Sequence, residues 1–185
     1  ASEDYTFYSR LKTNGLKIQG EYPSTFRLYH LFGPHPGCFT SATATYDPNA
    51  TQTDSFRGDI FIIREYLRQL KAIGIYDSTT IIITADHGNQ NESEDFVLHQ
   101  APCCIMLMKR AGADAKQPME VSEAHVSHED LFATVLEEMG LDSSSFAPAL
   151  YNHVDDMERE RYYYYTAQRS WGDGEVALKE YRIDG

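Results

Sequence analysis

The sequence predicts an α/β protein in which helices cover a mostly parallel sheet and a β-hairpin follows near the end of the chain. Three observations lead to this prediction. A long helical pattern precedes the unbroken β-branched run Thr79–Ala85, and Pro102–Met108 repeats such an apolar run. Strands without polar alternation are typical of parallel sheets that helices cover on both faces. Two further strand-like stretches flank Gly172-Asp173-Gly174, a pattern that favours a hairpin.

The composition is that of a globular protein and excludes several functional classes. With 185 residues the chain has the length of one ordinary domain. Sixteen basic against 28 acidic residues leave a net charge of -12, which argues against a nucleic-acid partner because phosphate-backbone binding needs a basic surface. No apolar run approaches the roughly 20 residues of a membrane helix. The three cysteines, Cys38, Cys103 and Cys104, are too few for a disulfide framework and leave the redox compartment open.

The first half of the chain contains one predicted strand and one predicted helix. Residues 1–23 are polar and loop-rich, with at most one short element. Ser24–Leu31 combines β-branched and aromatic residues, and it predicts a strand that ends at the breaker-rich Gly33–Gly37. Apolar residues at helical spacing predict an amphipathic helix over Ser55–Ile73, and Gly74 ends it.

The second half continues the alternation of strands and helices. We expect buried strands at Thr79–Ala85 and Pro102–Met108. Ser127 is placed to cap a helix over His128–Met139, with Asp130 as a weaker form of the capping-box residue. Such alternation of strands and helices is typical of layered α/β designs.

The predicted hairpin consists of Tyr162–Ala167 and Val176–Ile183. Its aromatic residues Tyr162–Tyr165, together with Trp171, have two interpretations. They can form an aromatic surface for a sugar or lipid headgroup, since such rings offer flat apolar area with polar tips. We favour ordinary sheet packing, in which alternate tyrosines face the domain, and we assign no site residue there.

The most informative residues are Asp86-His87-Gly88, directly after the strand Thr79–Ala85. In open α/β sheets, ligands bind beyond the carboxyl ends of the parallel strands, so this position faces the expected site. A carboxylate and an imidazole side by side are suited to bind one divalent cation. The alternative is that Asp86 caps a following helix and His87 is incidental.

Two more histidines strengthen the prediction of a site. His35 lies in the loop after the first predicted strand, and His99 follows His87 by twelve residues. Both loops can converge on the edge of the sheet that carries Asp86, and three converging loops are less easily accidental than one. For His30 and His125 we prefer a packing or surface role.

Taken together, these motifs resemble the sulfatase-like branch of the alkaline phosphatase superfamily. Within it the chain looks most like phosphoethanolamine transferases and lipoteichoic acid synthases, over about Phe26 to Leu141. The matching stretches are Ile81–Gly88, His30–Pro36, His99 at its spacing, Val126–Leu131, Leu136 and Gly140-Leu141. The resemblance implies a partial alkaline-phosphatase-like α/β/α sandwich.

The resemblance also implies a function for the site residues. Asp86 and His87 would be metal ligands, and His35 and His99 catalytic groups that hold the phosphoryl or sulfuryl oxygens. Donors of this kind suit Zn or Mn better than Ca. The implied substrate is a phosphate or sulfate ester, with a lipid or glycan headgroup as one option. By resemblance alone, we expect a location on the extracytoplasmic face of the cell membrane, with a membrane anchor in an N-terminal segment that is missing here.

The chain departs from the family at the nucleophile. Family members begin with a strand ending in an acidic metal ligand, followed by a Thr, Ser or modified Cys nucleophile, and neither is found here. Cys38–Ala42 lacks the Pro and Arg of the sulfatase signature and precedes the helix that leads to Asp86. The chain also starts at Ala1, without Met or a signal-like segment.

We therefore expect the C-terminal portion of a hydrolase or transferase, which is inactive alone. It would form a single domain over 1–185, with its core at 24–141 and the hairpin region at 160–185. The main alternative is a degenerate, non-catalytic binding module on the same scaffold. A two-metal relative resembling the phosphomutases is a weaker possibility.

Overall fold

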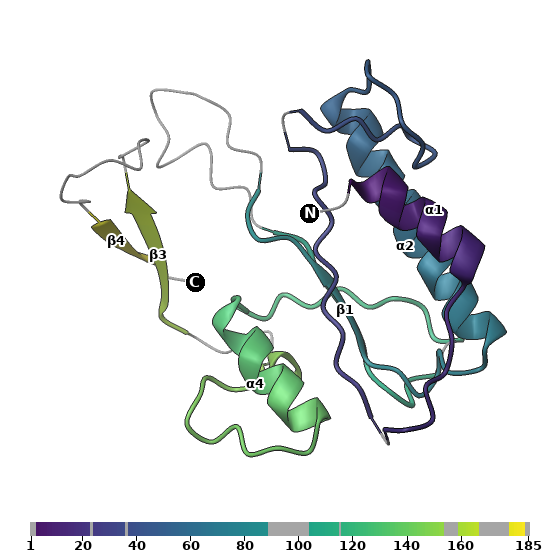
Figure 1. The fold of residues 1–185 in the computed structure, drawn as a ribbon. Helices are drawn as coiled ribbons and strands as arrows, with labels where there is room; N and C mark the ends of the chain where they lie inside the picture. Colours follow the sequence, from purple (N-terminus) through teal and green to yellow (C-terminus); the bar gives the residue numbers. More distant parts are fainter. Residues whose placement is uncertain are drawn as a thin grey trace. The chain divides into compact units, whose positions relative to one another are not determined.

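The structure, a computed structural model, contains helices and small antiparallel sheets (Figure 1). This confirms the predicted mixed α/β class. The residues that it describes are 3–22, 24–35, 37–88, 104–114, 116–153, 159–166 and 178–183. They belong to two compact units, Ala1–Gln117 and Pro118–Gly185. Among these residues, no helix has the length and apolar character needed to cross a membrane.

Two helices organise the first unit, α1 (Asp4–Asn14) and α2 (Gln52–Ala72). They lie side by side in Figure 1. The helix α2 confirms the predicted amphipathic helix and starts three residues earlier, because Thr51 forms a capping box. The Thr51 hydroxyl accepts from the Asp54 backbone N–H at 3.1 Å, and the Asp54 carboxylate accepts from the Thr51 N–H, also at 3.1 Å.

The buried side chain of Gln69 fastens the end of α1 to α2. Its amide nitrogen donates to the carbonyl oxygen of Leu11 at 3.1 Å and to Glu65 at 2.8 Å. Its amide oxygen accepts from the backbone N–H of Leu16 at 2.8 Å. The Leu11 carbonyl oxygen also accepts from the backbone N–H of Gly15 at 3.0 Å, so Gln69 adds a second donor to it and joins the end of α1 to α2.

A glycine in the middle of α2 lets a loop approach the helix closely. A Cβ atom at Gly58 would stand 2.4 Å from the carbonyl oxygen of Ser41 and 2.9 Å from a side-chain carbon of Thr40. One turn earlier, the Ser55 hydroxyl donates to the Thr40 carbonyl oxygen at 3.1 Å. The loop and the helix therefore meet with almost no side-chain layer between them.

The strand β1 (Ile81–Thr84) lies within the first predicted run, and β2 (Met106–Lys109) overlaps the end of the second and continues one residue beyond it, which confirms a strand in each. The predicted strand direction is wrong. The two strands pair antiparallel, with Ile81 opposite Lys109 and Thr84 opposite Met106, whereas we expected a mostly parallel sheet. An unbroken apolar run favours burial, but it carries no information on the direction of the neighbouring strand. The side chains of β1 are also only half-buried or exposed.

The predicted strand Ser24–Leu31 is absent from the described segment 24–31. Phe26 and Leu28 are exposed, at 57% and 81%. Ring contacts hold this segment instead, since Tyr29 packs against Phe7 of α1 and Tyr66 of α2 at centroid distances of 5.5 and 5.1 Å. Aromatic residues favour strands and ring contacts alike, so the composition did not separate the two outcomes.

The second unit contains α4 (Glu129–Glu138), the short 3₁₀ helix η1 (Leu150–Asn152) and the strands β3 (Arg161–Thr166) and β4 (Leu178–Ile183). The helix α4 confirms the helix predicted there. The strands β3 and β4 pair antiparallel, as predicted for the hairpin, while its Gly172-Asp173-Gly174 turn lies outside the described residues.

The predicted cap of α4 forms only in part. His128 occupies the cap position, and the Ser127 hydroxyl has no hydrogen-bond partner. The reciprocal half of the capping box is present, because the Asp130 carboxylate accepts from the Ser127 backbone N–H at 2.8 Å.

Candidate functional site

The residues Asp86 and His87 follow β1 directly and present their side chains to solvent. Their side chains are 70% and 57% exposed. One carboxylate oxygen of Asp86, Oδ1, accepts from the backbone N–H of His87 at 3.0 Å, which orients the carboxyl group. The other oxygen, Oδ2, lies 3.7 Å from Nε2 of the His87 ring.

A hydrogen bond to the backbone sets the tautomer of His87. Its Nδ1 lies 2.7 Å from the carbonyl oxygen of Gly88. A carbonyl oxygen only accepts, so Nδ1 carries the proton, and in the neutral ring Nε2 keeps its lone pair. Metal-binding histidines are usually oriented in this way, with the second ring nitrogen donating to a backbone carbonyl or a carboxylate.

The spacing of these two atoms suits ligands of one metal ion. Two ligands at the usual Zn distances of about 2.0–2.1 Å in a tetrahedral site stand about 3.4 Å apart. Asp86 Oδ2 and His87 Nε2 are separated by 3.7 Å, slightly more than that spacing. Within the described part of the chain, no group of three or more His, Cys, Asp or Glu side chains is placed to hold a metal. The pair therefore fits a metal as half of a ligand set.

The loop that carries His35 is held by a buried carboxylate. The His35 ring packs against Phe32 at a centroid distance of 4.8 Å. The backbone N–H groups of Phe32 and Gly33 donate to the two carboxylate oxygens of Asp4, each at 2.9 Å. The structure thus fixes the start of this loop on α1. The fourth predicted site residue, His99, lies outside the described residues.

The Asp4 carboxylate has an acidic neighbour on α2. Asp59 is buried, at 8% exposed. Burial first, and then the negative charge of Asp4, raise its pKa to about 7. One oxygen of Asp59, Oδ1, has no hydrogen-bond partner. Sequence analysis missed this pair, which joins residues 55 positions apart with no periodic signal.

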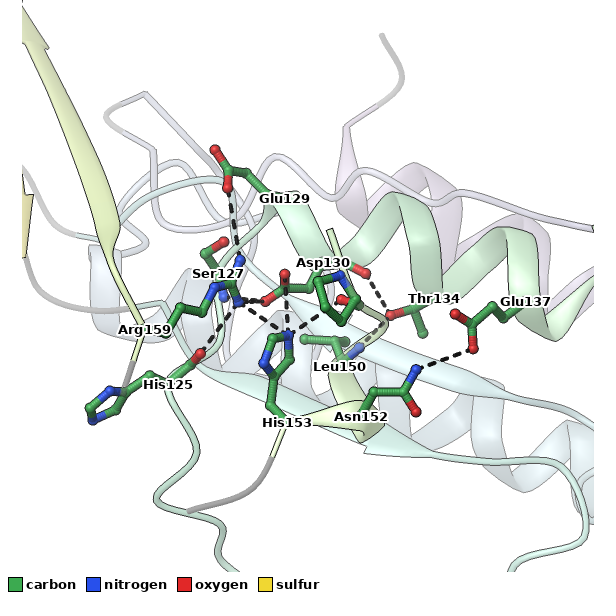
Figure 2. Close-up of polar contacts among 11 residues, drawn as sticks. His125, Ser127, Glu129, Asp130, Thr134, Glu137, Leu150, Asn152, His153 and Arg159 are labelled. Carbon is green, nitrogen blue, oxygen red and sulfur yellow. Dashed lines mark hydrogen bonds and ion pairs between the residues drawn. The ribbon is translucent and has the colours of Figure 1, made fainter. Parts of the chain in front are cut away.

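Sequence analysis also missed a buried polar cluster in the second unit, at the start of α4. Figure 2 shows Arg159 and His153 pointing toward Asp130, which is fully buried. Arg159 Nη1 donates to Asp130 Oδ2 at 2.6 Å and to the carbonyl oxygen of His125 at 3.4 Å. His153 Nε2 lies 3.4 Å from Asp130 Oδ1 and 3.1 Å from Arg159 Nη1. The carboxylate also accepts from the N–H of Ser127.

The Nε2 atom of His153 has both a donor and acceptors nearby. Arg159 Nη1 lies at 3.1 Å, whereas the Pro148 carbonyl oxygen at 3.3 Å and Asp130 Oδ1 at 3.4 Å would need a proton on Nε2. Arg159 Nη1 carries two protons and has Asp130 Oδ2 and the His125 carbonyl oxygen as acceptors, so these contacts do not set the tautomer of His153. We interpret the cluster as a structural tie between α4 and the segment that leads to β3.

The two other histidines considered from the sequence lie in different surroundings. His30 is exposed, and His125 is half-buried, with its Nδ1 buried and without a hydrogen-bond partner. The backbone of His125 contributes to the tie through its carbonyl oxygen.

No protein-family model, curated protein or solved structure matches this chain. Function is therefore inferred from its residues and their geometry. Of the groups described, the pair Asp86 and His87 combines exposed side chains with an oxygen and a ring nitrogen 3.7 Å apart. The carboxylates of Asp4 and Asp130 are buried and already accept hydrogen bonds from the protein.

Proposed function

We propose that this chain is the C-terminal portion of a metal-dependent, sulfatase-like enzyme that hydrolyses or transfers phosphate or sulfate esters. The observation that carries the proposal is the arrangement at the end of β1, where Asp86 Oδ2 and His87 Nε2 face one another at 3.7 Å. The bond from His87 Nδ1 to Gly88 supports it, because it leaves Nε2 free of a proton in the neutral ring.

The proposed roles divide the site between metal and anion binding. Asp86 and His87 would hold the ion, with Zn or Mn preferred to Ca for this donor set. When bound, such an ion lowers the pKa of a hydroxyl nucleophile and neutralises charge on the transferred group. His35 and His99 would donate charge-assisted hydrogen bonds to the phosphoryl or sulfuryl oxygens. The positive charge of a bound metal ion would attract an anionic substrate to the site although the whole chain has a net charge of -12.

The proposal also covers the larger context of the chain. The described units would form part of an alkaline-phosphatase-like α/β/α sandwich, and the nucleophile and the acidic metal ligand would lie in another segment. The substrate would be an ester with a lipid or glycan headgroup as one option. The location would be the extracytoplasmic face of the membrane.

The competing proposal is a non-catalytic binding module on the same scaffold. In that case Asp86 and His87 form an ordinary exposed ion pair, and such pairs contribute little to stability. Metal binding separates the two proposals. The enzyme proposal expects Asp86 and His87 to bind a divalent cation, whereas an ordinary ion pair does not bind one.

The decisive experiment measures the metal directly. Crystals soaked separately in Zn²⁺ and Mn²⁺ are expected to show an anomalous peak within bonding distance of Asp86 Oδ2 and His87 Nε2. In solution, calorimetric titration with Zn²⁺ should give a binding signal that Asp86→Asn and His87→Ala remove. The matched controls Asp77→Asn and His30→Ala change exposed residues of the same types and should keep it. Binding that survives His87→Ala would contradict the assignment.

A second measurement tests the claim that the chain is incomplete. The isolated chain should hydrolyse aryl phosphate and aryl sulfate esters no faster than buffer, because it lacks a nucleophile. Turnover that Asp86→Ala abolishes would show a complete active site and overturn this part of the proposal.

A further inference from the structure

The start of the His35 loop is anchored by one side chain of α1. The Asp4 side chain is buried, at 2% exposed, and it accepts two backbone N–H groups, from Phe32 and from Gly33, at 2.9 Å each. Two charge-assisted bonds to a single carboxylate define both the position and the orientation of this part of the backbone. Gly33 has a φ of +64°, a conformation in which a side chain would be strained.

The carboxyl group of Asp59 on α2 closes the other side of this anchor. Its Oδ2 lies 3.1 Å from the position that a Cβ of Gly33 would occupy, and Gly33 also donates to Asp4, so both buried carboxyl groups adjoin the same glycine. Two ionised carboxylates buried beside one another repel, so the pair favours a proton on one of its members. Asp59 is the one whose surroundings favour the neutral form, since its Oδ1 is buried without a donor.

Among the residues that the structure describes, no cation contributes to the pKa of Asp59. From α1, the charged group that faces Asp59 is Asp4. On α2, the residues one turn away from Asp59 are uncharged, namely Ser55, Phe56, Ile62 and Ile63. On the loop, the nearest titratable residue in the sequence is His35, whose ring packs on Phe32.

We propose that Asp4 and Asp59 form a proton-dependent clamp that positions the loop carrying His35. With Asp59 protonated, Asp4 keeps its full charge for the N–H groups of Phe32 and Gly33. Loss of the Asp59 proton places two negative charges beside Gly33 and loosens the backbone there. Asp4 is thus a positioning residue. The consequence for anion binding by His35 rests on the proposed function, whereas the clamp itself does not.

The test follows the clamped backbone directly, without substrate or metal. Amide hydrogen exchange of Phe32 and Gly33, measured by NMR on the whole chain and corrected for intrinsic rates, gives their protection at pH 6 and pH 8. In the wild type, protection should fall about tenfold at the higher pH, the usual worth of one hydrogen bond to a charged group. Asp59→Asn, whose amide can donate to Asp4 at any pH, should keep protection constant within about twofold.

Two further variants and a side-chain signal complete the test. Asp4→Asn should lower protection at both pH values, because its amide group has one acceptor oxygen in place of two. Asp77→Asn, the same change at an exposed site of the same unit, should behave as the wild type. The imidazole resonances of His35 should show a pH step shared with the Phe32 and Gly33 amides, and Asp59→Asn should remove that step.

The outcomes separate cleanly. Equal pH dependence in the wild type and in Asp59→Asn overturns the clamp, as does a pH-independent wild type. If Asp4→Asn fails to fold, the Asp59→Asn comparison still decides. If these results support the clamp but no metal binds at Asp86 and His87, then Asp4 and Asp59 still position the loop, and only the proposed function is refuted.

Discussion

Replacing Arg159 by Met should destabilise the second unit by about 3 kcal/mol, because it removes one partner of a buried ion pair. Asp130 is fully buried, and Arg159 is 14% exposed at its side chain. Without the guanidinium, the carboxylate keeps a single described donor, the N–H of Ser127 at 2.8 Å. The unpaired buried charge then costs more than the lost bond alone.

A double-mutant cycle isolates the interaction from other effects of the substitutions. Asp130→Asn alone should cost about 2 kcal/mol, since the hydrogen bond to Arg159 loses its charge. In the double variant the stranded charge is gone, so its cost should fall below the sum of the single costs by about 2 kcal/mol. The free energies come from urea unfolding at pH 7, followed by far-UV circular dichroism and by the fluorescence of Trp171, the single tryptophan.

A matched pair on the surface of the same unit serves as the control. Arg182 and Glu160 approach to 2.9 Å, but their side chains are 56% and 58% exposed. Arg182→Met should therefore cost less than about 1 kcal/mol. Single costs that add up to the double cost within about 0.5 kcal/mol would show that Arg159 and Asp130 do not stabilise one another, and our reasoning would fail.

Three other predictions concern the first unit. Burial raises the pKa of Asp59 to about 7, so the contribution of its proton to stability is fully present below the unfolded-state pKa of about 4 and is lost as the pH rises through 7. The stability gain from Asp59→Asn, measured by urea unfolding, should grow from near zero at pH 4 to about 2 kcal/mol at pH 8, allowing for screening; a constant difference would contradict this. Hydrogen bonds from Arg68 first, and then from Gln69, lower the pKa of Glu65 to about 2, so Glu65→Gln should cost about 1–2 kcal/mol at pH 7. That cost should disappear in acid unfolding as the pH falls from 4.5 to 2, and a cost that persists at pH 2 would be against it. Lys109 donates to backbone carbonyl oxygens in the 76–79 turn at 3.0 and 3.2 Å, so Lys109→Met should lower the thermal unfolding free energy by about 1–3 kcal/mol; an unchanged melting temperature would refute this.

The elements that the sequence predicted well carry local signals. The helix α2 combines apolar spacing with the capping residues Thr51 and Asp54, and both act within a few residues of one another. The strand β1 is recognisable from three consecutive isoleucines. The antiparallel direction of β1 and β2 was missed because it depends on a pairing partner more than twenty residues away. Residue composition carries no such information.

The same distinction between local and long-range signals applies to the candidate site. Asp86 and His87 were found because they follow a strand directly, but the tautomer of His87 became clear only from its contact with the Gly88 carbonyl. The cluster of Asp130 with Arg159 joins residues 29 positions apart. Its members come from a helix and an irregular segment, so neither helical nor strand periodicity brings them together.

The contact between Gly58 and Ser41 bears on how the protein tolerates change. Within a helix, alanine is normally preferred to glycine by about 1 kcal/mol, so a search for stabilising substitutions would select Gly58→Ala first. Here the added methyl group would need the space that the Ser41 carbonyl oxygen occupies, 2.4 Å away. At position 58, glycine is therefore expected to stabilise the protein more than alanine, which reverses their usual order in a helix. Among variants selected for folding, we expect glycine to be retained at position 58 while its helical neighbours on the exposed face diversify.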